Sequence, residues 1–348
     1  MRACGVFDET YEKDIAIIRT RGHWALLIGS VLFCFVVPSF ASDYWLNLLN
    51  NILITSIVVL GLQIATGYCG QISFGQPAFM AVGAFAGAVL THHCGISFWL
   101  ALPLAGIAAG IVGLIGGAPS LRITGFYLAM ATIAIFYLTM WVITHLQITG
   151  LYQGLPVAPP NIGGFVFDTD ARMYYIILSV TIIMTFFARN LVRTRVGRVF
   201  VAIRDNDLAA EVMGINVYYY KLLAFFISCF YAGIGGCLFG HWYMLVHSEQ
   251  YAFSHALIYI GMVIIGGIGS IPGVFFGVII LRMLDEFVLF VSPVLSDVFP
   301  RLGMAPAAAL SLSAFGLALI IFLIFEPRGL AYRWEIFKTS YRVYPYKK

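Results

Sequence analysis

The chain has 348 residues, of which 61% are hydrophobic and only 10% are charged, and its formal net charge is +4. Its mean hydropathy of +0.92 and this apolar content lie far above those of soluble domains, which are about 45–50% apolar. The composition excludes a soluble globular domain and indicates an integral membrane protein. The net charge says little about nucleic acid, and we expect no nucleic-acid partner.

Apolar runs long enough to cross ~30 Å of hydrocarbon recur along most of the chain, and such runs predict membrane-spanning helices. We expect ten spans, at about 24–40, 44–66, 77–91, 98–117, 123–146, 172–188, 221–243, 253–268, 272–293 and 304–326. The predicted fold class is therefore an all-α polytopic membrane protein with about ten transmembrane helices, forming one domain over residues 1–348.

The basic residues indicate which connections face the cytoplasm. Of the 20 Lys and Arg residues, 17 fall in residues 1–23, at Arg122, in 189–221 or in 327–348. By the positive-inside rule these regions are cytoplasmic, including both termini. Six expected spans separate the first region from the third, and four follow the third. Both numbers are even, so all of these regions lie on the same side of the membrane, as the rule requires. Segments 91–97 and 147–171, which lack Lys and Arg, are then expected outside.

The third span begins with an unusually polar stretch, GYCGQISFGQPAF, which carries Gln71, Ser73 and Gln76 among glycines. Irregular backbone at membrane depth is tolerated where it is buried in protein or lines a watery cavity. Together with Ser270, these side chains are candidates for the lining of a translocation path. Polar side chains that only hold helices together would produce the same pattern.

Glycines mark two further features of the spans. The stretch GGIGSIPG over residues 266–273 interrupts an apolar run and indicates either a tight turn between spans or a broken, re-entrant element. Gly83 and Gly87 form a small-xxx-small pair, which predicts a close contact with another helix.

One group of charges falls inside an expected span. Arg282, Asp285 and Glu286 are spaced i, i+3 and i+4, so they share a helix face and the cation can be neutralised locally. Ionisable residues at membrane depth are costly and often functional. The cluster is either a relay for a proton or substrate or a self-neutralised structural element.

Motifs for catalysis are missing from the sequence. The chain has no GxxxxGK[ST] loop and no HExxH motif, and its seven histidines are dispersed. We therefore expect no catalytic residues, no metal site and no cofactor of its own. Energy from ATP would have to come from a partner.

The basic cytoplasmic segment contains a short predicted helix. Asp205, Asn206 and Asp207 can cap its start, and Gly214 can end it. Its apolar side chains, Leu208, Ala209, Val212 and Met213, are spaced to form one face. An exposed apolar face flanked by charge favours a protein partner, and a helix lying on the bilayer is the alternative. Three acids on the helix disfavour anionic lipid.

The same segment carries a family resemblance. GRVFVAIRDNDLAAEVMGINVYYYKLLAFFISCFYAGIGGCLFG over residues 197–240 resembles the signature of LivM-type permeases of ABC importers for branched-chain amino acids. GYCGQISFGQPAFMAVGAF, GMVIIGGIGS and FEPRGL resemble the same family in the same order. The resemblance covers nearly the whole chain and implies a ten-span fold like that of type II ABC importers in a prokaryotic plasma (inner) membrane.

The resemblance also implies partners and a site. The family pairs with a second, LivH-like permease, with two cytoplasmic ATPase subunits that bind ATP and Mg, and with an extracytoplasmic substrate-binding protein. It implies that segment 189–220 is the coupling loop and 327–348 a cytoplasmic tail. The residues expected to contact the ATPase are Arg204, Asp205, Asp207, Leu208, Glu211, Val212, Met213 and Gly214.

The resemblance is weaker in two respects. Loop 147–171 would dock the binding protein, but the family often has TGG-x-x-GL where this chain reads TGLYQGLP. No residue identifies the substrate, so the same type of permease for urea, amides or aromatic acids remains an alternative. An ion-coupled secondary transporter that uses Arg282, Asp285 and Glu286 is a further one.

Overall fold

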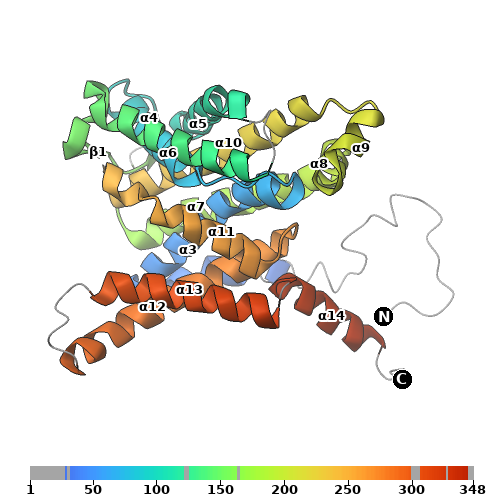
Figure 1. Cartoon of the computed structure of the whole chain (residues 1–348). Coiled ribbons are helices and arrows are strands. Elements are labelled where there is room, and N and C mark those ends of the chain that lie inside the picture. The colour runs from blue at the N-terminus through green and yellow to red at the C-terminus, as the bar shows by residue number, and fades with distance from the viewer. Residues whose placement is uncertain are drawn as a thin grey trace.

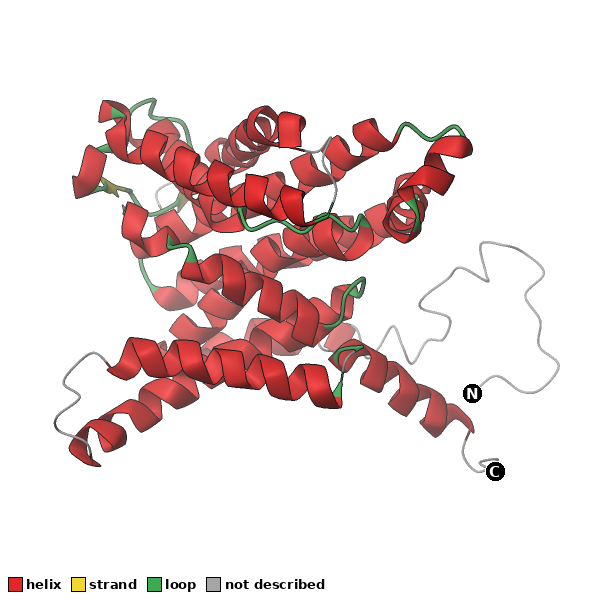
Figure 2. Cartoon of the chain, in the orientation of Figure 1, coloured by secondary structure: helices red, strands yellow, loops and turns green. Residues whose placement is uncertain are grey.

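A computed structural model describes residues 28–29, 32–120, 125–162, 165–298, 306–326 and 328–343. The expected cytoplasmic segment 1–23, part of the first span and Arg122 lie outside these residues. Within them the chain is almost entirely helical, with a few two-residue strands (Figure 2).

The long helices are α3 (Asp43–Leu62), continued by the π-helical turn η2 (Gln63–Tyr68), α4 (Gln76–His92), α5 (Phe98–Ser120), α6 (Phe126–His145), α7 (Asp170–Arg193), α10 (Val217–Tyr243), α12 (Ile271–Val298) and α13 (Pro306–Phe325). The shorter helices are η1 (Val37–Ser39), η3 (Gln147–Thr149), η4 (Leu151–Gln153), α8 (Arg195–Asp205), α9 (Asp207–Val212), η5 (Ser248–Tyr251), α11 (Ser254–Gly266) and α14 (Leu330–Val343). Strands β1 (Leu155–Pro156) and β4 (Leu245–Val246) pair antiparallel, as do β2 (Asn161–Ile162) and β3 (Phe165–Val166).

A helix lies at each of the nine expected positions from residue 44 onward. Among the described residues, five helices are long and apolar enough to cross a membrane, or six if α13 and α14, which meet at a 40° bend, form one span. Helix α4 has 17 residues, and α11 has 13. The structure thus supports a polytopic helical protein, whereas the expected number of ten crossings stays a prediction.

The core is built around α10, which packs against α3, α4 and α5. Glycines allow its backbone to approach α4 closely. A Cβ added at Gly83 would lie 2.2 Å from the carbonyl oxygen of Gly233, and one added at Gly236 would lie 1.9 Å from that of Met80. One at Gly87 would lie 2.6 Å from Cys237 Sγ. The close helix contact predicted from Gly83 and Gly87 is confirmed.

The glycine-rich stretch after residue 266 is a tight turn between two packed helices, α11 and α12. Gly267 has a φ of 113°, a conformation open chiefly to glycine. A Cβ at Gly266 would lie 2.1 Å from the carbonyl oxygen of Gly273, so the helices touch where they leave the turn. At 1.5 Å per residue, α11 is only about 20 Å long, which is shorter than the ~30 Å hydrocarbon layer.

The connections segregate to two ends of the molecule. Figure 1 shows α8, α9 and α14 at one end of the helices and β1 at the other. The described parts of the two segments expected to be cytoplasmic, α8 with α9 and α14, therefore share an end, and β1, in the loop expected outside, lies opposite. Helices α8 and α14 themselves were not expected, because their amphipathic sequences interrupt the apolar pattern that identified the spans.

Candidate functional site

The candidate site is the connection between α7 and α10, which consists of α8 and α9. Helix α8 buries Gly197, Phe200 and Ile203 and thereby holds the connection against the membrane helices. It ends at Asp205, and Asn206 has an extended backbone, with a φ of −162° and a ψ of 108°. Asp205 therefore does not begin the short helix, as the sequence suggested, but ends the one before it.

Helix α9 is capped at both ends by its own sequence. Asn206 Oδ1 accepts a hydrogen bond from the backbone N–H of Ala209 at 3.0 Å, which satisfies a donor that the first turn leaves open. At the other end Gly214 has a φ of 83°. The N–H of Ile215 donates to the carbonyl of Ala210 at 3.1 Å, and that of Gly214 to Glu211 at 2.9 Å. This paired pattern is a Schellman motif, so the loop is a defined element.

The outer face of α9 is apolar and uncovered. The exposed fractions of Leu208, Val212 and Met213 are 72%, 89% and 83%. Glu211 is exposed beside them, whereas Ala210 is buried against the core. Ala209 is exposed as well, so the exposed apolar face predicted from the spacing of Leu208, Ala209, Val212 and Met213 is confirmed.

Two charged residues of the segment, Arg204 and Asp207, contact the rest of the protein. Lys221 Nζ lies 3.2 Å from Asp207 Oδ2, and the lysine is only 9% exposed. Arg204 Nη1 donates to the carbonyl of Gly67 at 3.0 Å, while its Nε and Nη2 contact Asp205 Oδ1. Arg204 and Asp207 thus anchor α9, and the outward face is formed by Leu208, Glu211, Val212 and Met213.

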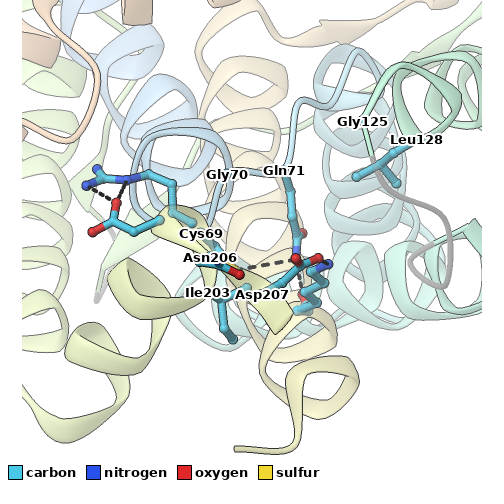
Figure 3. Close-up of a pocket in the computed structure, with 11 residues that line it drawn as sticks. Cys69, Gly70, Gln71, Gly125, Leu128, Ile203, Asn206 and Asp207 are labelled. Carbon is cyan, nitrogen blue, oxygen red and sulfur yellow. Dashed lines mark hydrogen bonds and ion pairs between the residues drawn. The ribbon is translucent and has the colours of Figure 1, made fainter. Parts of the chain in front are cut away.

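A polar cavity of about 300 Å³ lies beneath this anchor. It is bounded by the α3–α4 connection at Cys69, Gly70 and Gln71, by the start of α6, and by the α8–α9 junction. Figure 3 shows Gln71 and Asp207 converging on it from different elements. Gln71 Nε2 donates to the carbonyl of Lys221 at 2.9 Å. The α3–α4 connection, α9 and α10 are therefore joined by direct polar contacts.

Of the candidates for a translocation path, Gln71, Ser73 and Gln76 are buried within this chain, and Ser270 is half-buried. Gln76 Nε2 donates to the carbonyls of Val58 at 3.1 Å and Ser228 at 3.2 Å, and Ser228 Oγ donates back to Gln76 Oε1. Ser73 Oγ accepts from the N–H of Gly75, and Ser270 Oγ accepts from that of Gly273. The Gln76 contacts join α4 to α3 and α10, as in the helix-joining alternative, whereas those of Ser73 and Ser270 are local. A role of Gln71, Ser73, Gln76 and Ser270 in a path stays a prediction.

The charge cluster on α12 is only partly brought together. Arg282 Nη1 lies 3.9 Å from Asp285 Oδ2, but Glu286 accepts a hydrogen bond from the Tyr44 hydroxyl on α3. Arg282 Nη2 donates to Thr55 Oγ1 at 2.7 Å. The partners Tyr44 and Thr55 lie more than 200 residues away in sequence, and spacing along one helix gives no signal for them.

Comparison with known proteins identifies a family. A family described as "Branched-chain amino acid transport system / permease component" matches residues 44–323. The high-affinity branched-chain amino acid transport system permease protein LivM of Escherichia coli K12 is 28% identical over 331 residues, which cover 88% of this chain and 73% of the relative. No solved structure matches the chain.

Two more distant relatives are named for different substrates, branched-chain amino acids and ribose. The probable branched-chain amino acid transport permease protein LivM of Methanocaldococcus jannaschii is 25% identical over 316 residues, covering 79% of this chain and 89% of the relative. The ribose import permease protein RbsC of Haemophilus influenzae is 25% identical over 291 residues, which cover 78% of this chain and 85% of the relative.

The family match begins within α3 and ends within α13, so it includes the packed helices, the α8–α9 connection and the cavity beneath it. The motifs that carried the resemblance in sequence lie within the matched residues, apart from the last, which begins at the final residue of α13, Phe325. The members of this family are multi-pass membrane proteins of ABC transporters, and they are permease components and not catalytic enzymes. Because the family match covers most of the chain, this chain belongs to the permease components of branched-chain amino acid transport systems.

Proposed function

We propose that the chain is the transmembrane subunit of an ATP-driven importer for branched-chain or other hydrophobic amino acids. In this assembly it pairs with a LivH-like second permease, two cytoplasmic ATPase subunits that bind ATP and Mg, and an extracytoplasmic substrate-binding protein. The observation that carries the proposal is the exposed apolar face of α9, formed by Leu208, Val212 and Met213. Three large exposed apolar side chains on a capped helix favour a protein partner.

The anchors of α9 make it suitable as a lever. A force on α9 reaches α10 through the Asp207–Lys221 ion pair and reaches the end of η2 through the bond from Arg204 to the Gly67 carbonyl. We propose that closure of the ATPase pair moves α9 and that these contacts carry the movement to α3 and α10. Two packed helices move as bodies because close-packed interiors transmit displacement.

We propose that the opposite end docks the substrate-binding protein through segment 147–171. This segment is held in place by the pairing of β1 with β4 and by the bond from Trp242 Nε1 to Asp170 Oδ1 at 2.7 Å. Leu151 occupies the position at which the family often has the second glycine of TGG. The φ of Leu151 is 55°, which lies in the left-handed region that glycine adopts without a steric cost. This backbone conformation explains why glycine suits the position.

The coupling proposal is tested by two variants of α9. Leu208→Asp places a carboxylate in the apolar contact, and Glu211→Lys reverses a charge beside it. Loss of a central interface contact costs about 2 kcal/mol or more, so ATP-dependent leucine uptake by the reconstituted importer should fall at least about tenfold. Association with the ATPase subunits, measured by co-purification, should fall with it.

The matched control is Ile336→Asp on α14, an exposed apolar residue at the same end of the molecule. Its uptake should stay close to wild type. Unchanged uptake and unchanged ATPase association in both α9 variants would contradict the coupling role. Uptake by the chain without ATPase subunits, driven by a proton or sodium gradient, would contradict the importer itself. Urea, an amide and an aromatic acid are assayed beside leucine to decide the substrate class.

A further inference from the structure

A second cavity, of about 270 Å³, lies deep among the membrane helices and away from α9. It is bounded by α3, α4, α10, η5, α11 and α12. Apolar side chains of Ile54, Met80 and Phe239 form part of its wall, and Asn51, Thr55 and Arg282 supply polar groups. Its volume is near the lower end of ligand pockets, roughly 300–1,000 Å³, which suits a small molecule.

The cavity has a positive wall. Arg282 is the sole Lys, Arg, Asp or Glu among the described residues that line it. Its Nη2 donates to the neutral hydroxyl of Thr55 at 2.7 Å, and Thr55 in turn donates to Asn51 Oδ1 at 3.2 Å. Asp285 lies outside the lining, and its Oδ2 is 3.9 Å from Nη1, which is beyond hydrogen-bonding distance.

One donor of the guanidinium has no acceptor among the residues that the structure describes. This donor, Arg282 Nε, is buried. A guanidinium carries five N–H donors in a planar fork that matches a carboxylate with two parallel bonds. A buried cation whose donors are incompletely satisfied is costly. An anion that enters the cavity would lie beside this cation and could accept from donors that Thr55 and Asp285 leave unsatisfied.

The place of Arg282 along α12 corresponds to a depth near the middle of a bilayer that α12 enters at its first residue. Arg282 is eleven residues from the start of α12 at Ile271, a distance of about 17 Å along the helix, in a layer of ~30 Å. A site at this depth lies between the two ends of the molecule, where a transported molecule must pass.

We propose that this cavity is a transient binding site for the carboxylate of an amino acid in transit, with Arg282 as its ligand. The inference rests on the proposed function, since it names the group of the substrate that the permease recognises. The carboxylate would accept from the guanidinium while an aliphatic side chain packs against Ile54, Met80 and Phe239. Because Thr55 and Asn51 hold one side of the guanidinium, its orientation is set before the substrate arrives.

The first experiment needs no variant. The assembled permease–ATPase complex, without the soluble binding protein, is placed in nanodiscs and bound to radiolabelled leucine and, separately, to radiolabelled 4-methylpentanoate, which lacks the amine. Unlabelled 4-methylpentanoate should displace leucine, whereas 3-methylbutylamine, which lacks the carboxylate, should not at the same concentration. Displacement by the amine and not by the acid overturns the proposal.

The second experiment changes the cation. Arg282→Gln should reduce binding of both labelled acids at least about tenfold, because a charge-assisted bidentate bond is lost. Arg282→Lys, which keeps the charge but not the fork, should give an intermediate value. Arg333→Gln removes an exposed arginine of α14 that pairs with Glu326 and should bind as wild type. Co-purified ATPase subunits and basal ATP hydrolysis show whether each variant assembles. If Arg282→Gln does not assemble, the displacement experiment on the wild-type complex decides whether the carboxylate is recognised.

The two proposals fail separately. Suppose that the wild-type importer takes up leucine and that an assembled Arg282→Gln complex binds both labelled acids as well as wild type does. This result overturns the carboxylate site but supports the importer. Conversely, 4-methylpentanoate binding that depends on Arg282, without any leucine uptake, supports the site and overturns the proposed substrate. Unchanged binding in Arg282→Gln is also the result that the self-neutralised structural cluster predicts.

Discussion

Lys221 is a nearly buried ammonium at the start of α10, and its counter-charge comes from α9. Asp207→Asn would leave that ammonium without a carboxylate. Breaking a buried ion pair costs about 3–5 kcal/mol, but the Asp207 side chain is 40% exposed, so solvent screening reduces the expected loss to about 1–2 kcal/mol. We expect a lower Tm of the purified complex in thermal unfolding.

A double-mutant cycle separates the pair from its surroundings. Lys221→Met in the Asp207→Asn background removes the unpaired charge, so much of the lost Tm should return. Asp205→Asn is the matched control, because its carboxylate is 62% exposed and the Tm should change little. A Tm for Asp207→Asn equal to that of Asp205→Asn would show that the ion pair contributes no stability.

The outward side chains of α9 were predictable from sequence, but the anchoring residues were not. Local spacing places Leu208, Val212 and Met213 on one face whatever the rest of the fold does. Arg204 and Asp207 were grouped with them because they are neighbours in sequence. Their partners are the Gly67 carbonyl, 137 residues away, and Lys221, which lies beyond the α9–α10 turn. Only tertiary structure reveals these contacts.

At the scale of elements, the crossing of α4 and α10 depends on glycine at the point of contact. Gly236→Ala would place a Cβ 1.9 Å from the Met80 carbonyl oxygen, and backbone atoms cannot rotate away. Overpacking of this kind costs typically 1–3 kcal/mol and more where backbone must shift. We expect a lower yield of monodisperse protein in size-exclusion chromatography and a lower Tm.

Gly316→Ala in α13 is the matched control for this crossing. A Cβ at Gly316 would have no atom within 4 Å among the described residues, and alanine favours helix over glycine by about 1 kcal/mol. Its yield and Tm should equal or exceed those of wild type. Equal behaviour of the two variants would mean that α4 and α10 do not approach as closely as the structure has them.

Apolar runs predicted the positions of the helices better than they predicted their lengths or whether each one spans the membrane. The span expected at 253–268 is α11, whose 13 residues end at the glycine-rich turn that the sequence marks, but which is too short to cross the hydrocarbon layer as a straight helix. Helices α8 and α14 lie in segments expected to be a loop and a tail. Their apolar residues are spaced for one face and not continuous, so a search for continuous hydrophobic runs passes over them.

At the scale of the whole molecule, the positive-inside rule orients the two ends that Figure 1 shows. Three helices, α5, α6 and α7, separate Cys94 from α9, so an odd number of crossings places these sites on opposite sides. Cys94 is exposed, Cys34 is half-buried and lies within the first expected span, and Cys69, Cys229 and Cys237 are buried. The chain therefore carries its own reporter for the face opposite α9.

Thiol labelling tests this orientation directly. With Cys4→Ser as background, a membrane-impermeant maleimide added to spheroplasts should label Cys94, and Cys94→Ser should abolish the signal. Met213→Cys in the doubly substituted background places a thiol on the exposed face of α9, where Met213 is 83% exposed. It should react in inside-out vesicles and not in spheroplasts. Labelling of both sites from one side would require an even number of crossings between them and would remove α9 from the face on which an ATPase can bind.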